Sequence, residues 1–494
     1  MKTLLINIVR NYPVFLYLLP VFFVLHGYTE NYDLIPAKDA IVLTCIYLLV
    51  SALLSVAAWL LYRNFTKANL LAFWIMAFHF FFGAVQDILK KTFPDSFVNR
   101  YIFILPFFLL VFILIIISLK RMKKKPVRFS FFLNSLFLIL IIIDGIILLS
   151  KSITEGKTIQ SYSQSIAPCD TCSKQDIYLV MADGYPGLTE LKDLFNYDNT
   201  PFISQLKQRG FHVVDSSTSN YNFTPFSVSS MLDMNYLENI AGSNSNKHDI
   251  ALCYKKIKRN TSFTYFSQLG YSIYNYSIFD LEKQPSLTAP TFLPRKTTPI
   301  TSQTFLSRIE RELGHHLVTS LKIKTFIKSI REYDLRNNNK LFDKTKAIVK
   351  EQNMQPKFVY THLVIPHYPY YFDSTGKSIP YEKLTEDLAF NKEAFISYLK
   401  YSNNQLLNLT DYILATSKKP PVIILMSDHG FREFKEATDK KYHFLNLNAI
   451  YFPDRNYSSF YKGMSNINQF RILFNSQFGQ QLSLLKDSSS FLSE

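Results

Sequence analysis

The stretch VIILMSDHG (residues 422–430) joins an uninterrupted apolar run to a turn that contains an aspartate, a histidine and a glycine. A short apolar run bounded by turn residues is typical of a strand that is buried on both faces. The stretch DIYLVMADG (residues 176–184) repeats this design, with Asp183 directly after the apolar run. Two such strands predict a buried sheet with polar groups gathered where its strands end.

Short β-rich runs alternate with helical patterns between residues 175 and 455. The expected strands cover residues 177–182, 211–214, 271–277, 358–365 and 422–426. The expected helices cover residues 201–209, 261–269 and 392–416. Parallel strands need a crossover connection, which is usually a helix. The alternation therefore predicts an α/β sandwich with a mainly parallel central sheet.

The first 150 residues hold five apolar runs, over residues 12–28, 40–62, 70–85, 101–119 and 129–150. About 20 apolar residues cross a bilayer as a helix. The second, fourth and fifth runs meet that length, whereas the first and third are short. A cleaved signal peptide is the alternative for the first run, but four more runs follow it and no small-x-small cleavage site is obvious. We expect an all-α domain of about five transmembrane helices.

These patterns divide the chain into four expected parts. The transmembrane domain covers residues 1–150, and a polar linker without a helix or strand period covers 151–174. The α/β domain covers 175–455. The last part, 456–494, is rich in Ser and Asn and is expected to be peripheral.

Basic residues in the short loops indicate the orientation in the membrane. Lys2 and Arg10 precede the first run. Six basic residues separate the fourth run from the fifth: Lys120, Arg121, Lys123, Lys124, Lys125 and Arg128. This cluster outweighs an opposing loop with Lys90, Lys91 and Arg100. We expect a cytoplasmic N-terminus and an external α/β domain.

The net charge of +16 does not indicate a nucleic-acid partner once its distribution is considered. Residues 1–150 hold 14 Lys and Arg against 6 Asp and Glu, so half of the excess belongs to the membrane part. That half is a topological signal and attracts anionic membrane surfaces. The remaining bias suits anionic lipid headgroups or phosphate esters. The sequence leaves the oligomeric state open.

Two of the four cysteines form the motif CDTC, at Cys169 and Cys172. A CxxC pair without a second pair is weak support for a zinc site. In an external compartment a local disulfide is at least as well supported. Cys45 lies in an apolar run and Cys253 stands apart.

Polar residues that directly follow the expected strands are candidates for the chemistry, because ligands of open α/β sheets bind beyond the carboxyl ends of the strands. They are Asp183, His367, Asp428 and His429. Two carboxylates and an imidazole suit Mn²⁺, Zn²⁺ or Mg²⁺. The structural alternatives are a turn-forming Asp-Gly pair at Asp183 and a capping aspartate beside a solvated histidine at 428–429.

The stretch SNYNFTPFSVSSMLDM (residues 219–234) offers a nucleophile. Thr224 is either an ordinary helix cap, with Pro225 at the first helical position, or a nucleophile held at a helix N-terminus. A nearby dication would lower the pKa of its hydroxyl. The helix N-terminus would face an anionic substrate with backbone N–H groups.

In this order, a carboxylate after the first strand, a threonine at a helix start, His-x-Pro and SDHG resemble the alkaline phosphatase superfamily, in its sulfatase-like branch. The membrane anchor before an α/β domain is similar to lipoteichoic acid synthases and bacterial phosphoethanolamine transferases. The resemblance implies a sulfatase-like catalytic domain over 175–455 and a location in a bacterial cell membrane or inner membrane. It implies a metal shell of Asp183, Thr224, Asp428 and His429, with Thr224 forming the covalent intermediate.

Three further residues near these motifs are candidates for the site, His367 as a catalytic residue and His443 and Arg432 as substrate-binding residues. His367, in IPHYPYYFD, resembles the family's histidine near the substrate phosphoryl group or a second metal. His443 is either a further active-site histidine or a surface residue, and Arg432 either binds a phosphate oxygen or is solvated. His362, inside the expected strand, we interpret as a histidine packed in the fold.

One departure from the family pattern indicates the reaction. Formylglycine sulfatases carry Cys or Ser followed by x-Pro-x-Arg, whereas Thr224 is followed directly by Pro225 and the arginine is missing. We therefore predict a membrane-anchored, Mn²⁺- or Zn²⁺-dependent enzyme that transfers or hydrolyses a phosphoryl-linked group. The group is a lipid headgroup such as phosphoethanolamine or phosphoglycerol. The alternatives are a sulfuric ester or phosphomonoester hydrolase of the same superfamily and a catalytically inactive binding protein.

Overall fold

The computed structural model describes residues 12–32, 34–94, 96–124, 126–158, 166–167, 169, 172–238, 247–287, 295–309, 324–351 and 354–493. The chain divides into two compact units. The helical unit comprises residues 1–162 and 290–323, and the sheet unit comprises residues 163–289 and 324–494. Lys2, Arg10 and Lys125, which supported the expected orientation, lie outside the described residues.

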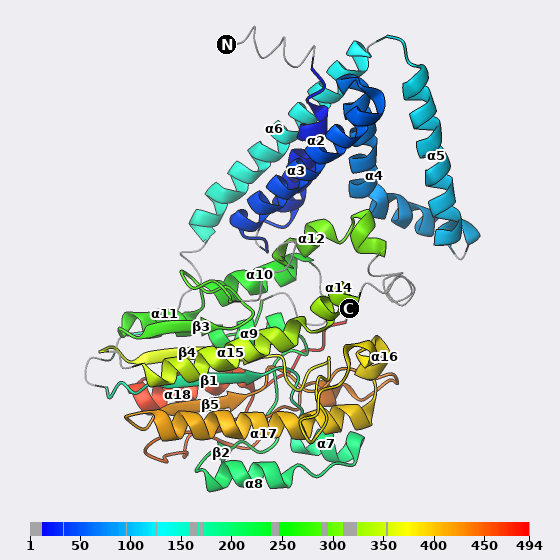
Figure 1. Cartoon of the computed structure of the whole chain (residues 1–494). Helices are drawn as coiled ribbons and strands as arrows, with labels where there is room; N and C mark the ends of the chain where they lie inside the picture. Colours follow the sequence, from blue (N-terminus) through cyan, green and yellow to red (C-terminus); the bar gives the residue numbers. More distant parts are fainter. Residues whose placement is uncertain are drawn as a thin grey trace. The chain divides into compact units, whose positions relative to one another are not determined.

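Five apolar helices make up most of the helical unit (Figure 1). They are α2 (Phe15–Glu30), α3 (Ala37–Tyr62), α4 (Phe65–Thr92), α5 (Tyr101–Arg121) and α6 (Val127–Thr158). By length and composition, α3, α4, α5 and most of α6 can cross a membrane, and α2 is shorter with 16 residues. The predicted all-α domain of about five apolar helices is confirmed.

The segment 295–309 belongs to the helical unit, although in sequence it lies between two stretches of the sheet unit. It contains the short helix α12 (Thr298–Thr301). Ile300 of this helix is buried in the apolar core of the helical unit. A Cβ added at Gly27 would lie 2.9 Å from Cγ1 of Ile300, so the glycine in α2 makes room for this side chain.

Polar contacts hold the other end of the same segment on α4. The backbone N–H of Gly83 donates to the carbonyl oxygen of Gln303 at 2.9 Å. The guanidinium of Arg308, which is buried, pairs with the carboxylate of Asp87 at 2.6 Å. A Cβ added at Gly83 would collide with the carbonyl and the side chain of Gln303. The segment therefore depends on glycines in two apolar helices.

A six-stranded sheet with the order β2-β6-β5-β1-β4-β3 forms the centre of the sheet unit. The strands are β1 (Ile177–Ala182), β2 (His212–Val213), β3 (Ser272–Tyr276), β4 (Lys357–Leu363), β5 (Val422–Met426) and β6 (Asn448–Tyr451). Strands β5, β1, β4 and β3 pair in parallel, whereas β6 pairs antiparallel with β5 and β2. The predicted mainly parallel sheet is confirmed, and β6 is a strand that the sequence analysis missed.

Helices cover both faces of this sheet (Figure 1). One layer contains α7 (Leu188–Phe195), α8 (Thr200–Gln208), α15 (Tyr333–Lys350) and α17 (Lys392–Thr416). The other contains α9 (Thr224–Asp233), α11 (Thr261–Gln268) and α18 (Gln469–Phe478). Tyr178 and Val180 of β1 face the first layer, and Leu179 and Met181 face the second. Burial on both faces explains why β1 reads as one continuous apolar run.

The remaining helices of the sheet unit are α10 (Lys247–Lys258), α14 (Lys324–Arg331) and α16 (Glu386–Ala389). Residues 456–494, which were expected to be peripheral, contribute α18 to the core, where Phe470 and Phe474 are fully buried. Cys169 and Cys172 form a disulfide, which decides between the two alternatives for the CDTC motif.

The segment 295–309 provides a first test. Gly83→Leu should displace it from α4, because any side chain at this position meets backbone atoms of Gln303. We expect faster amide hydrogen exchange across 295–309 in the detergent-solubilised chain, and a loss of stability on the order of 1–3 kcal/mol as in other overpacked sites. Gly145→Leu is the matched control, because a Cβ at Gly145 meets nothing within 4 Å. Unchanged exchange in Gly83→Leu would show that the contact does not hold the segment.

Candidate metal and nucleophile site

Three neighbouring strands bring polar side chains to one edge of the sheet. Asp183 directly follows β1, Asp428 and His429 come after β5, and His362 is the penultimate residue of β4. Because β5, β1 and β4 are adjacent and parallel, their carboxyl ends meet at the same edge. Ligand atoms of Asp183, His362 and Asp428 all lie within 4.8 Å of one another. These three side chains form a compact group that could hold one cation.

Unpartnered buried atoms in this group fit a bound metal ion. Asp183 Oδ1, Asp428 Oδ2 and His362 Nε2 are buried and have no hydrogen-bond partner among the described residues. Leaving a buried polar atom unsatisfied costs about 1–3 kcal/mol, and more for a charged group. Two carboxylates and an imidazole are ligands that Zn²⁺ and Mn²⁺ accept. The residues present therefore fit a divalent cation at this edge of the sheet.

His429 presents a lone pair to the same group. Its Nδ1 lies 2.6 Å from the carbonyl oxygen of Gly430, which can only accept a hydrogen bond, so Nδ1 carries the proton. The other ring nitrogen, Nε2, is then unprotonated, and it lies 3.4 Å from Asp428 Oδ2 and 3.7 Å from Asp183 Oδ1. A backbone carbonyl behind the ring is the usual way to orient a metal-binding histidine.

The protonation states in this group suit cation binding. Burial by itself would raise the pKa of Asp183, but contact with His362 and the fields of His367 and His429 outweigh it and hold that pKa below its ordinary value. Burial lowers the pKa of His429. Carboxylate and neutral imidazole are the forms that bind metal ions.

Thr224 lies next to this group and contacts His429. It is the first residue of α9, Phe223 is the N-cap, and Pro225 lies in the first turn. Thr224 therefore lies one position inside the helix rather than at the cap position. Its Oγ1 lies 3.2 Å from Nε2 of His429. A helix N-terminus such as the start of α9 leaves backbone N–H groups without intrahelical acceptors and favours negative charge.

Two glycines allow the turns after β1 and β5. Gly184 has a φ of +64°, in the left-handed region that favours glycine, and its N–H donates to Asp428 Oδ1 at 3.0 Å. Gly430, in contrast, has no φ in that region. A Cβ there would collide with the carbonyl of Tyr442 and lie 2.8 Å from Glu190 Oε2. Gly430 is therefore required by lack of space.

Hydrogen bonds from several elements fix the backbone that carries Asp428. The Ser427 hydroxyl accepts from the N–H of Tyr185 at 2.8 Å, which ties the β5 turn to the β1 turn. The hydroxyl of Ser227, one turn into α9, donates to the carbonyl of Asp428 at 2.5 Å. The start of α9 and the end of β5 are thus joined directly, which keeps Thr224 beside His429.

The three expected substrate-contact residues lie around this group. His367 Nε2 is 3.9 Å from Glu433 Oε1, and a Cβ at Gly184 would lie 3.6 Å from the His367 ring. The guanidinium of Arg432 lies over the ring of Phe223, 4.7 Å from its centroid. Arg432 is therefore beside the residue that precedes Thr224.

His443 is half-buried, and its Nδ1 is a buried atom without a partner among the described residues. Burial lowers the pKa of His443 to about 4, with smaller contributions from Arg432 and His429. His443 therefore lies near Arg432 and His429. Its role in binding stays a prediction.

His362 is the residue that sequence reasoning assigned to packing alone. It is completely buried in β4, and its Nδ1 is 2.9 Å from the hydroxyl of Tyr360. Its Nε2 nevertheless lies 3.6 Å from Asp183 Oδ2. The signal that could have found it is its position at the carboxyl end of a buried strand, the criterion already used for Asp183.

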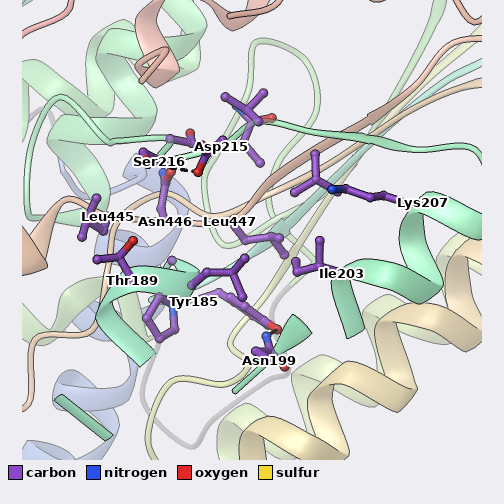
Figure 2. A pocket seen from close by; sticks show the side chains of 17 residues that line it. Tyr185, Thr189, Asn199, Ile203, Lys207, Asp215, Ser216, Leu445, Asn446 and Leu447 are labelled. Carbon is purple, nitrogen blue, oxygen red and sulfur yellow. Dashed lines mark hydrogen bonds between the residues drawn. The ribbon is translucent and has the colours of Figure 1, made fainter. Parts of the chain in front are cut away.

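A cavity of about 130 Å³ lies near this edge of the sheet, but none of the site residues lines it. Figure 2 shows its walls, which include Tyr185, Asn199, Lys207, Asp215 and Asn446. The cavity is thus distinct from the group around Asp183.

Comparison with known proteins finds solved structures only. No protein-family model and no curated protein matches the chain. The C-terminal periplasmic domain of EcEptC from Escherichia coli is 14% identical and matches 67% of this chain and 94% of its own, with a TM-score of 0.39. The C-terminal periplasmic domain of phosphoethanolamine transferase EptC from Campylobacter jejuni is 14% identical, with 64% and 92% covered and a TM-score of 0.35.

A phosphonate monoester hydrolase of Agrobacterium radiobacter is 13% identical, with 62% of this chain and 74% of that one covered and a TM-score of 0.39. At such identities and TM-scores, function has to be argued from the residues of the site.

Glu190 on α7 is hydrogen-bonded to the residue that directly follows the SDHG turn. Its side chain is completely buried, its Oε1 accepts from the N–H of Phe431 at 3.2 Å, and its Oε2 has no partner among the described residues. Burial raises the pKa of Glu190 well above its ordinary value, although hydrogen bonds from Phe431 and Gly187 oppose the shift. Burial therefore favours the neutral form of this carboxyl in the folded chain.

This shift predicts a pH-dependent stability. The unfolded chain releases the Glu190 proton near pH 4.5, its ordinary pKa, whereas the folded chain retains it. Stability is therefore lost as the pH rises above 4.5 toward the raised pKa. Glu190→Gln should raise the thermal midpoint at pH 7.5 and give no gain below pH 4.5. Glu436→Gln, at an exposed glutamate, is the control. A Glu190→Gln midpoint equal to wild type at pH 7.5 would contradict a neutral buried carboxyl.

Proposed function

We propose that this chain is a membrane-anchored, metal-dependent enzyme that transfers or hydrolyses a phosphoryl-linked group through a covalent Thr224 intermediate. The substrate class is a phosphodiester lipid, and the group is a headgroup such as phosphoethanolamine or phosphoglycerol. One observation carries the proposal. Thr224 is the first residue of α9, and its hydroxyl lies 3.2 Å from Nε2 of His429. Buried carboxylates with unpartnered oxygens lie beside this pair.

The metal would be held by Asp183, Asp428 and His429, with His362 close by, and the donor set suits Zn²⁺ or Mn²⁺. When bound, such an ion supplies positive charge that lowers the pKa of an adjacent hydroxyl and stabilises charge on phosphoryl oxygens. The number of ions per chain is left to measurement.

Thr224 performs the covalent step. Its Oγ1 bonds to phosphorus, the bond between phosphorus and the alcohol oxygen of the lipid breaks, and the proton of the Thr224 hydroxyl ends on that alcohol oxygen. The lipid alcohol leaves, and the headgroup phosphate stays on Thr224. An acceptor hydroxyl or water then attacks the same phosphorus, the bond between phosphorus and Oγ1 breaks, and the proton of the attacking group ends on Thr224. Backbone N–H groups at the start of α9 stabilise the anionic phosphoryl oxygens, since a helix N-terminus favours negative charge.

The surrounding residues bind the phosphoryl group in this proposal. Arg432 is held beside Thr224 by its stacking on Phe223, where it supplies a fixed positive charge. His367 and His443 flank the group and are candidates to contact the phosphate or to protonate the leaving oxygen. Five apolar helices would let the lipid donor arrive from the bilayer, with the sheet unit on the external side and the N-terminus in the cytoplasm.

The nucleophile is tested by matched threonine variants. Thr224→Ala should lower headgroup release from labelled phosphatidylethanolamine and phosphatidylglycerol by about a thousandfold or more, as losses of nucleophiles do. Thr200→Ala is the control, because Thr200 opens α8 with the same Thr-Pro-Phe sequence and is exposed. Equal rates for wild type and Thr224→Ala on every phosphate and sulfate ester tested would remove the nucleophile assignment.

The metal ligands are tested by metal content rather than by activity. Purified chain should retain Zn²⁺ or Mn²⁺ after dialysis, and Asp428→Asn should lose most of it, because a neutral amide replaces a charged ligand. His362→Ala measures whether the missed histidine belongs to the same site. Asp439→Asn, at an exposed aspartate, should bind as wild type does. Full metal content in Asp428→Asn would place the ion elsewhere.

A further inference from the structure

The segment 485–493, called the strap below, runs beside the residues that lead to Thr224. Ser490 donates its backbone N–H to the carbonyl of Asn220 at 2.9 Å and forms an isolated parallel bridge with Tyr221. The Ser489 hydroxyl donates to the carbonyl of Ser219 at 2.6 Å. The side chain of Asn220 donates to the carbonyl of Ser488 at 2.9 Å. The serines of this stretch are therefore hydrogen-bonded to residues 219–221.

Asn222, two residues before Thr224, makes two hydrogen bonds to Leu492 of the strap. Its amide nitrogen donates to the carbonyl of Leu492 at 3.0 Å, and its amide oxygen accepts from the N–H of Leu492 at 2.8 Å. The Leu492 side chain is buried in a small apolar cluster with Tyr221 and with Phe226 of α9. Leu492 thus has polar and apolar contacts with residues within three positions of Thr224, namely Tyr221, Asn222 and Phe226.

Phe491 of the strap contacts a second part of the site. Its ring lies 5.2 Å from the ring of His443, edge to face. His443 also meets the ring of Phe434 at 5.4 Å, edge to face. The His443 ring therefore contacts two aromatic side chains, one of which is in the strap.

We propose that the strap is a positioning element for the site: it fixes the backbone before Thr224 through Asn222 and the ring of His443 through Phe491. The strap acts through these residues and does not contact substrate. The proposed effect of the strap on catalysis rests on the proposed function. The proposed restraint of residues 219–224 is independent of that function. Each hydrogen bond makes a modest net contribution to stability, so several together restrain a turn that has no regular ladder of its own.

Hydrogen exchange tests the restraint without reference to activity. In Asn222→Ala, amides of residues 219–224 in the metal-loaded full chain should exchange at least about tenfold faster, because both bonds to Leu492 are lost. Asn222→Asp retains the acceptor and should fall between wild type and Asn222→Ala. Leu484→Ala, at an exposed leucine outside the strap, should exchange as wild type. Wild-type exchange in Asn222→Ala overturns the proposal.

Steady-state kinetics test the effect on the site. In Phe491→Ala and Asn222→Ala, kcat should fall about 10–100-fold while KM and metal content stay near wild type, because a misplaced group affects the transition state most. Phe491→Tyr keeps an aromatic ring against His443, so its kcat should return to near the wild-type value. A Phe491→Ala defect caused by loss of folding would not predict this recovery. A rise in KM with unchanged kcat, or a failure of Phe491→Tyr to recover, overturns the positioning role. If wild type cleaves no ester, the proposed function fails and hydrogen exchange alone decides the strap.

Discussion

Buried negative charge at the ends of adjacent strands is the constraint on which the rest of the sheet unit depends. Asp183 and Asp428 are almost completely buried and lie close together after β1 and β5. A carboxylate removed from water costs several kcal/mol unless opposite charge or donors compensate it. The imidazoles of His362 and His429 offer only lone pairs or a single N–H, so a bound cation would neutralise the remaining negative charge of the two carboxylates. A metal ion would therefore serve both folding and chemistry here.

The residues around this charge come from parts of the chain that are far apart in sequence. Ser227 of α9 bonds to the backbone of Asp428, and Glu190 of α7 supports the turn that follows. The strap joins the residues before Thr224. Each of these contacts limits the position of a side chain that already belongs to the site. The site is consequently preorganised by its supports, as positioned catalytic groups require.

Local pattern was enough for much of the fold. The continuous apolar runs of β1 and β5 and the cap-to-cap length of α8 follow from period and turn residues, which act within a few positions. The same reasoning placed Asp183 and Asp428 at strand ends. It missed β6, a short strand between β2 and β5 that follows a helical turn without a clear turn signal. It also read His362 as packing, since a buried strand histidine has the same sequence pattern whether or not it faces a carboxylate.

The sequence by itself determined the two kinds of domain, the mainly parallel sheet and the residue types able to bind a cation. These depend on hydrophobic period and on side-chain chemistry, which neighbours in the chain settle. Only the tertiary structure decided that Thr224 meets His429, that His362 joins the carboxylates, and that the strap holds Asn222. The reason is physical: such contacts join segments separated by tens to hundreds of residues, and their geometry is fixed by packing against the whole sheet rather than by local conformation.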